Sequence, residues 1–138
     1  MELQPFGTFR APLRPVEFVG STPRGRRIVG PIDGARLEGP HVRASQRGTS
    51  AADWLLSGPD GTTMIDVRIS LRCDDGAFLH VTYTGRADWA RGVGGGPVYS
   101  AFRFDTEDER YRWLQPRLVI GKGQVQLDHG AYELFLLA

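Results

Sequence analysis

The chain has 138 residues and a net charge of +1, from 17 basic and 16 acidic residues, with 41% hydrophobic and 24% charged residues. This length fits one domain, residues 1–138, with a proper core, and the composition excludes a disordered chain. Because basic and acidic residues are interspersed along the sequence, we expect no nucleic-acid partner.

Cysteine and histidine usage argues against disulfides and metal sites. Cys73 is the only cysteine, so no intramolecular disulfide and no thiolate cluster can form. His41, His80 and His129 have no spacing typical of metal ligands, and we expect no metal and no cofactor. No run approaches the ~20 apolar residues of a membrane span, and the N-terminus lacks a signal-peptide pattern. We therefore expect a cytoplasmic protein without a membrane partner.

Short apolar runs between turn signals predict an all-β fold. Eighteen glycines and nine prolines separate runs rich in Val, Ile, Leu, Phe, Tyr and Thr, which is typical of antiparallel strands. Some runs will merge, so we expect a single antiparallel β-barrel of roughly eight to ten strands. The predicted strands are Leu3–Ala11, Val16–Val19, Arg27–Ile32, Arg36–Glu38, His41–Ser45, Ala52–Ser57, Thr62–Cys73, Ala77–Thr84, Val98–Phe104, Arg117–Ile120, Gly123–Leu127 and Tyr132–Leu137.

A cluster of arginines lies between the second and third predicted strands. Arg24, Arg26 and Arg27 surround Gly25 and follow Pro23. This composition is typical of a solvated turn, and phosphate binding is the alternative that the charge alone would support.

The turn Gly58–Gly61 joins strands 52–57 and 62–73. With a two-residue tip at positions 59 and 60, Asp53 pairs with Asp66, and Arg68 lies one diagonal step away. Trp54 then joins the apolar face of the sheet. A shift of one residue in this pairing would reverse the arrangement, because side chains alternate between the two faces of a strand.

The next hairpin has one apolar and one polar face. Asp74-Asp75-Gly76 predicts a three-residue turn that pairs Cys73 with Ala77. The apolar face then carries Ile65, Val67, Ile69, Leu71, Cys73, Ala77, Leu79, Val81 and Tyr83. The polar face carries Asp66, Arg68, Ser70, Arg72, Phe78, His80, Thr82 and Thr84.

One short helix is predicted near residues 106–114. Thr106 and Glu109 have the spacing of a capping box. Tyr111, Trp113 and Leu114 follow, and the proline at position 116 ends the helix.

Asp53, Asp66 and Arg68 are the predicted catalytic residues. Two carboxylates across a strand pair repel each other. In a poorly solvated site one carboxyl keeps its proton while the other ionises beside the arginine, which is what a general acid–base pair requires. If this face is exposed instead, Asp66 and Arg68 form only a weak surface ion pair.

Aromatic and polar residues on the same strands are the predicted ligand contacts. His80 either carries a proton or faces solvent, and Glu133 is either turned outward or buried with a raised pKa. The aromatic side chains either line a pocket or fill the core. The predicted substrate-binding residues are Trp54, His80, Tyr83, Phe102, Phe104, Tyr111, Trp113 and Glu133.

Several segments, in order along nearly the whole chain, resemble the uncharacterised family catalogued as domain of unknown function 3237. They are Thr22-Pro23-Arg24-Gly25-Arg26-Arg27, Leu37-Glu38-Gly39-Pro40, Ala52-Asp53-Trp54, Asp66-Val67-Arg68, Asp74-Asp75-Gly76-Ala77 and Tyr111-Arg112-Trp113-Leu114. Ser50 and Ala51 stand where the family usually has a glycine pair, and Gln115 stands where it often has asparagine. The resemblance implies a compact antiparallel β-barrel and implies no particular activity.

The sequence therefore predicts a small-molecule-binding barrel that catalyses a cofactor-free proton transfer, of the isomerase, lyase or cyclase type, on a small organic or ring-containing substrate. Asp53 and Asp66 would share the acid and base roles, and Arg68 would stabilise an anion. The alternative is a non-catalytic carrier or sensor barrel with Asp66 and Arg68 facing solvent. A third hypothesis is a structural module whose apolar outer face packs in a homo-oligomer, which requires the polar face of strand 65–73 to point into the barrel.

Overall fold

Eleven strands and a single 3₁₀ turn make up the computed structural model, which describes residues 1–138. In chain order they are β1 (Leu3–Pro12), β2 (Glu17–Thr22), β3 (Gly25–Pro31), β4 (Arg36–Glu38), β5 (Arg43–Gln46), β6 (Ala52–Ser57), β7 (Thr62–Cys73), β8 (Phe78–Asp88), β9 (Val98–Asp105), η1 (Arg112–Leu114), β10 (Val119–Val125) and β11 (His129–Leu137).

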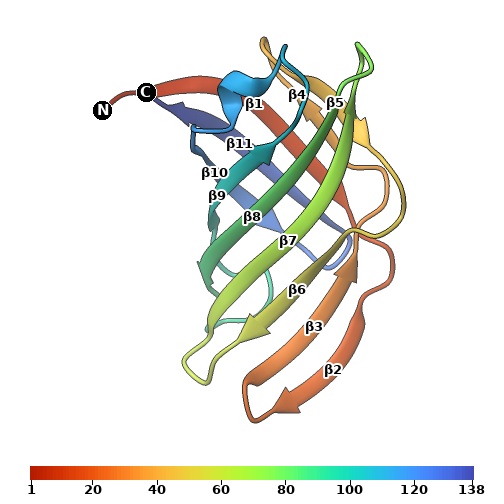
Figure 1. Cartoon of the computed structure of the whole chain (residues 1–138). Coiled ribbons are helices and arrows are strands. Elements are labelled where there is room, and N and C mark those ends of the chain that lie inside the picture. The colour runs from red at the N-terminus through yellow and green to blue at the C-terminus, as the bar shows by residue number, and fades with distance from the viewer.

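The sheet closes on itself through the pairing of β7 with β8. Eight strands form the closed ring, in the order β7-β5-β4-β1-β11-β10-β9-β8, and β2, β3 and β6 are three additional strands. All pairings are antiparallel. The all-β barrel predicted from the sequence is confirmed (Figure 1).

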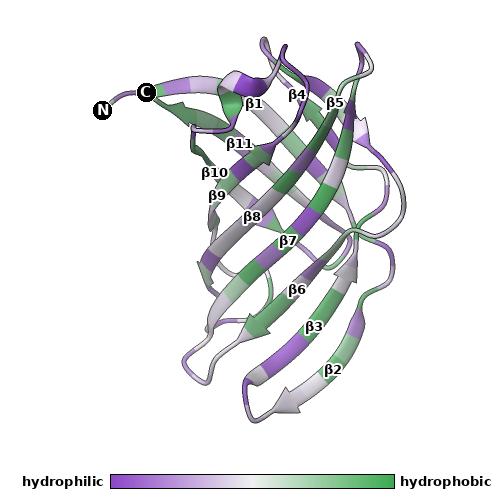
Figure 2. Ribbon diagram, viewed as in Figure 1, coloured by the Kyte–Doolittle hydropathy of each residue, from purple (hydrophilic) through white to green (hydrophobic).

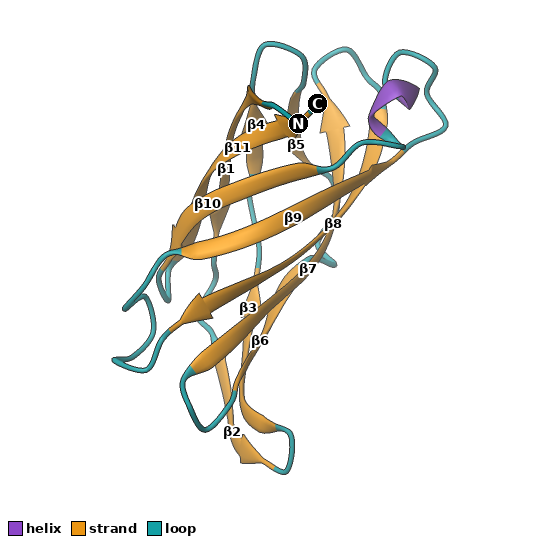
Figure 3. Cartoon of the chain, turned by 90° about the vertical axis from the view of Figure 1, so that its left-hand side faces the viewer, coloured by secondary structure: helices purple, strands orange, loops and turns teal.

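One edge of β7 is shared by two partners, because β7 is longer than either. Its C-terminal end pairs with β5, whereas its N-terminal half pairs with β6. Strands β6, β3 and β2 therefore branch from the ring, and the β2–β3 hairpin extends past its lower end (Figures 1 and 3). We call β2, β3 and β6 the side sheet.

Strict alternation of side chains builds the core. Along β7 and β8 the buried residues alternate with exposed or half-buried ones, and Figure 2 shows this as alternating bands of hydrophobic and hydrophilic residues. Tyr83 and Phe102 stack inside the barrel with ring centroids 4.2 Å apart, and Phe9 packs edge-on against both. The predicted apolar face of the central hairpin, from Ile65 to Tyr83, lines the interior, and the polar face with Asp66 and Arg68 points outward.

The register of β6 against β7 differs from the prediction by one residue. Asp53 pairs with Val67, not with Asp66, and Ser57 pairs with Thr63. The turn has a three-residue tip because Gly61, at φ +86°, adds one residue to it. The amide of Gly61 donates to the carbonyl of Gly58 at 3.1 Å. The predicted pairing of Asp53 with Asp66 is therefore wrong.

The segment 106–114 contains one 3₁₀ turn, Arg112–Leu114, instead of the predicted two-turn helix. Thr106 does not form a capping box with Glu109. Its hydroxyl accepts from the amide of Asp108 at 3.1 Å and donates to the carbonyl of Phe78 at 2.7 Å. These bonds hold the segment as a local turn against Phe78, the first residue of β8.

Candidate functional site

The observed register separates the three residues predicted to be catalytic. Asp53 points into the barrel and is only 4% exposed, whereas Arg68 is exposed on the outer face and Asp66 is half-buried there. Trp54 also lies on the outer face, with the Arg68 guanidinium 5.4 Å from its ring centroid. The predicted Asp53–Asp66–Arg68 cluster is therefore wrong, and so is the predicted place of Trp54 on the apolar face.

The oligomeric-module hypothesis offered β7 as an apolar outer face. Ile65, Val67, Ile69 and Leu71 are buried in the interior, so β7 does not provide that face. The polar residues of β7 face outward.

Asp53 is a buried acid held by a backbone amide. Its Oδ1 accepts a hydrogen bond from the amide of Asp66 at 3.1 Å. Burial raises the pKa of Asp53 to about 7; the bond from Asp66 opposes this shift and the charge of the Asp66 carboxylate adds to it. At neutral pH the carboxyl and carboxylate forms are therefore present in similar amounts, so Asp53 can either accept or donate a proton.

Three hydroxyl-bearing side chains share the interior with Asp53. Tyr83, Tyr132 and Ser100 are all buried, and the rings of Tyr83 and Tyr132 lie 5.7 Å apart. Burial raises the pKa of both tyrosines, and the charge of Asp53 raises both further. Both phenols therefore stay protonated near neutral pH and remain hydrogen-bond donors.

The hydroxyl groups of Tyr132 and Ser100 are both buried, and neither makes a well-formed hydrogen bond to the rest of the protein, although Ser100 lies close enough to Tyr132 to oppose the rise in its pKa. Leaving a buried polar group unpaired costs roughly 1–3 kcal/mol, so each such group in a folded protein calls for an explanation, such as a bound water, strain or a functional role. Tyr132 is also close enough to Asp53 for the charge of that carboxylate to raise its pKa.

Glycines on neighbouring strands make room for these two side chains. A Cβ at Gly123 would come within 2.8 Å of Cγ of Tyr132. A Cβ at Gly85 would collide with the hydroxyl of Ser100. The positions of Tyr132 and Ser100 thus depend on the absence of side chains opposite them.

Further polar groups line the interior toward the end of the barrel where β6 turns into β7. The hydroxyls of Ser57 and Thr63 lie 2.7 Å apart. Ser57 also borders a cleft of about 630 Å³. The β2–β3 turn, the β6–β7 turn and the loop 89–93 form its walls.

The other predicted contacts divide between the interior and the surface. Tyr83, Phe102 and Phe104 are buried inside the barrel. His80 and Glu133 are exposed on the outer face, so neither can touch a ligand in the interior, and their predicted place in a pocket is corrected.

The two aromatic residues of segment 111–113 lie at the upper end of the barrel. The Tyr111 hydroxyl donates to Oδ2 of Asp75 at 2.6 Å, and Trp113 is 38% exposed and packs edge-on against His41. Tyr111 thus braces the β7–β8 turn, and Trp113 lies on the surface.

Sequence inspection alone missed Ser100 and Tyr132. Both lie in predicted strands, and the glycines at positions 121 and 123 were the available signal that a large side chain crosses that part of the sheet. No group of three or more His, Cys, Asp or Glu residues is placed to hold a metal ion. No helix is long and apolar enough to cross a membrane.

Comparison with known proteins finds one matching protein family and several solved structures of similar fold. The family model described as "Protein of unknown function (DUF3237)" matches residues 1–137. Among curated proteins there is no match.

Three solved structures resemble the barrel along nearly its whole length. A β-barrel-like protein from Acinetobacter baumannii is 24% identical with a TM-score of 0.87, covering 99% of this chain and 96% of its own. A conserved protein of unknown function from Rhodopseudomonas palustris is 21% identical with a TM-score of 0.88, covering 99% and 97%. An enzyme from Penicillium herquei is 22% identical with a TM-score of 0.69, covering 99% and 98%. At these identities the likeness establishes a shared fold.

Proposed function

The chain belongs to the DUF3237 family of proteins of unknown function, and from that premise we propose that its barrel binds a small organic molecule and that Asp53 transfers a proton to or from it without a cofactor. The observation that carries this proposal is a buried carboxyl with a pKa of about 7 in an interior that also holds the buried hydroxyls of Tyr132 and Ser100. Perturbed acids in enclosed sites are often catalytic.

In the proposed reaction, the Asp53 carboxylate removes a proton from a C–H or O–H group of the substrate. The electron pair of that bond stays on the substrate, and negative charge develops on an oxygen atom of the substrate. Tyr132 and Ser100 donate hydrogen bonds to this oxygen. Asp53 then returns the proton at another atom, which completes an isomerisation or a ring closure. A general acid–base group typically contributes ~10²–10⁴-fold to the rate.

Asp66 has an indirect role in this proposal. Its amide orients the Asp53 carboxyl, and its charge helps to raise the pKa of Asp53. Arg68 faces solvent and is assigned no contact with the substrate.

The structure from Penicillium herquei supports an enzymatic role, because a protein of related fold is described as an enzyme. The shared fold alone does not transfer its chemistry, since one fold hosts many activities. The proposal therefore depends on the groups around Asp53.

The test is exchange of solvent deuterium into a ring ketone with an acidic α-hydrogen. We expect the wild-type protein to speed exchange into 2-tetralone in D₂O, followed by ¹H NMR, and Asp53→Asn to lose that acceleration by at least ~10²-fold. Tyr132→Phe should retain part of it. Glu133→Gln, which removes an exposed carboxylate, is the matched control and should behave as wild type. Equal exchange by wild type and Asp53→Asn would refute the proposal.

A non-catalytic carrier is the second candidate, and one observation favours it. Asp66 and Arg68 face outward, and aromatic rings occupy much of the interior. If the protein is a carrier, its wild-type and Asp53→Asn forms would bind ring compounds equally well, and neither form would promote deuterium exchange.

A further inference from the structure

The cleft at the side sheet is a second feature that the chemistry at Asp53 does not use. Its volume, about 630 Å³, lies within the range of small-molecule sites. One wall is the β2–β3 turn, and the facing wall is the β6–β7 turn packed on the loop 89–93. A hydrogen bond joins the two parts of the facing wall, since the amide of Trp89 donates to the carbonyl of Gly61 at 3.0 Å.

The cleft and Asp53 lie on the same face of the side sheet. On β6, Asp53 and Leu55 are buried toward the interior, and alternation places Ser57 on that face as well. The bond from Ser57 to Thr63 agrees, because Thr63 is completely buried. Four residues of extended strand span roughly 13 Å, which is the separation between Ser57 in the cleft and Asp53.

Strand β3 continues this face with a cation at its outer end. Arg26 pairs with Ser57, and Ile28 pairs with Leu55. Ile28 is buried, so Arg26, two residues before it, projects from the same face at the rim. Arg26 and Ile28 both line the cleft.

The rim of the cleft is positively charged. Arg24 and Arg26 line it, both are exposed, and neither takes part in any of the protein's ion pairs. Asp60 is the acid in the cleft, and its oxygens accept bonds from the amide and hydroxyl of Thr62 at 2.9 and 3.0 Å. Free guanidinium groups in a cleft that is also lined by Ile28 and Trp89 are suited to a molecule with one anionic end and one apolar part.

We infer that the cleft is the entrance to the barrel interior and that Arg26 binds the anionic group of a ring-containing organic acid, whose apolar part lies against Ile28 and Trp89 and whose other end points toward Asp53. This inference rests on the proposed function and adds the substrate class to it. Arg26, one of the three clustered arginines for which the sequence predicted a solvated turn, thereby becomes a specificity element.

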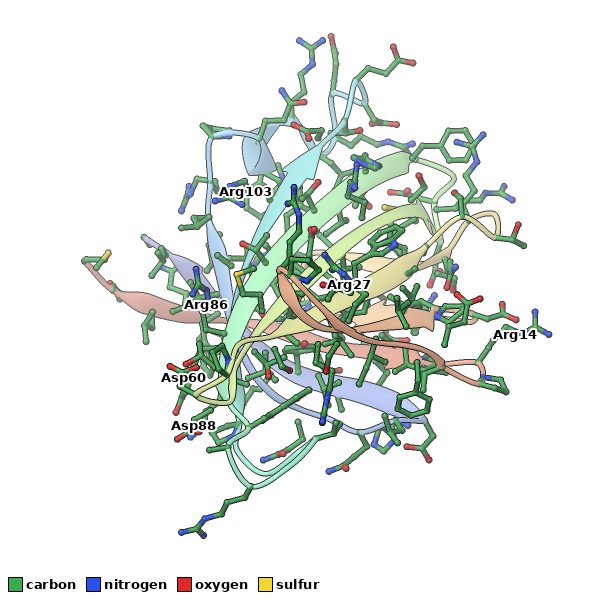
Figure 4. All side chains as sticks on the ribbon, turned by 90° about the horizontal axis from the view of Figure 1, so that it is seen from below. Arg14, Arg27, Asp60, Arg86, Asp88 and Arg103 are labelled. Atoms are coloured by element: carbon green, nitrogen blue, oxygen red, sulfur yellow. The ribbon has the colours of Figure 1, made fainter.

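The test uses two fluorescent probes with the same aromatic rings. 8-Anilinonaphthalene-1-sulfonate carries a sulfonate, and N-phenyl-1-naphthylamine is its uncharged counterpart. We expect wild type to prefer the sulfonate, and Arg26→Gln to weaken its binding about tenfold while changing binding of the neutral probe less than twofold. Arg86→Gln is the matched control, because Arg86 extends from the outer face of β8 (Figure 4) and has no ion pair; it should bind both probes as wild type does.

Each outcome decides the inference. Equal weakening by Arg26→Gln and Arg86→Gln would show a general charge effect and overturn it, as would equal binding of both probes by wild type. Arg26→Lys should restore part of the preference, which a folding defect would not allow. Asp53→Asn should keep the preference for the sulfonate. If wild type does not promote deuterium exchange but its preference for the sulfonate depends on Arg26, the proposed catalysis is refuted and the anion site is supported. If wild type promotes exchange but the preference does not depend on Arg26, only the anion site is refuted.

Discussion

Asp53 sets an unusual dependence of stability on pH. Its pKa is about 7 in the folded protein against 3.8 for the ordinary side chain. Protons bind more tightly to the folded state, so the free energy of unfolding falls as pH rises from about 4 to about 7. Each pKa unit corresponds to about 1.4 kcal/mol, so the full effect is roughly 4 kcal/mol.

We predict that wild type loses roughly 3 kcal/mol of unfolding free energy between pH 5 and pH 8 relative to Asp53→Asn. Urea unfolding of both proteins at a series of pH values measures this difference, and the comparison removes the contribution of the histidines. Glu133→Gln should follow wild type. Parallel curves for wild type and Asp53→Asn would contradict a raised pKa at Asp53.

The surface carboxylates act on stability in the opposite direction, and they do so at lower pH. Hydrogen bonds from Arg36 and Tyr111, respectively, lower the pKa of Asp74 and Asp75, and those from Arg110 lower that of Asp108 to about 2. These groups stabilise the fold above about pH 4 and lose that contribution as pH falls further. Between pH 5 and pH 8 they stay ionised, and Asp53 is the titrating carboxyl.

At the scale of elements, Gly61 fixes the register that places Asp53 inside the barrel. It has a φ of +86°, and a Cβ there would overlap the backbone of Ala90. We predict that Gly61→Ala destabilises the protein by roughly 1–3 kcal/mol. Gly76→Ala is the matched control, because Gly76 has a similar φ of +95° but open space around it, and it should cost less. Thermal unfolding of the two variants measures the difference; equal losses would mean that packing against Ala90 contributes nothing.

The two hairpins explain which part of the register could be predicted. The tips Pro59-Asp60-Gly61 and Asp74-Asp75-Gly76 both end in a glycine with positive φ and make the same pair of backbone bonds. The second was predicted as a three-residue turn, and its pairing of Cys73 with Ala77 is confirmed by the bond between them. The first was predicted to have a two-residue tip, Pro59-Asp60, and the missing third residue, Gly61, shifted the predicted pairing by one position and moved Asp53 to the wrong face.

Long-range closure explains what local patterns could not provide. Alternation correctly predicted which residues of β7 and β8 share the apolar face, but not that this face is the inner one. The proximity of Tyr132 to Asp53 and to Ser100 depends on β9, β10 and β11 closing the ring, and no short-range signal reports which strands become neighbours. The residues of the candidate site were thus visible as strand residues, but their proximity was not.

At the scale of the whole molecule, stability should be distributed unevenly between the ring and the side sheet. Strand β7 is paired along both edges, with β8 on one side and with β5 and β6 on the other. Strand β2 pairs only with β3, and all of its residues are exposed or half-buried. Elements with few buried contacts open locally far below the global unfolding free energy.

We therefore predict that amide hydrogens of Glu17–Thr22 exchange with solvent at least ~10²-fold faster than those of Thr62–Cys73, as measured by hydrogen–deuterium exchange with mass spectrometry. Because the β2–β3 turn forms one wall of the cleft, saturating 8-anilinonaphthalene-1-sulfonate should slow exchange in residues 21–26 and leave β7 unchanged. At a probe concentration equal to the wild-type dissociation constant, Arg26→Gln should lose most of this slowing while the difference between β2 and β7 stays intact. Uniform protection across both strands would show that the side sheet opens only with the ring, and a ligand would then have to enter the barrel without movement of that wall.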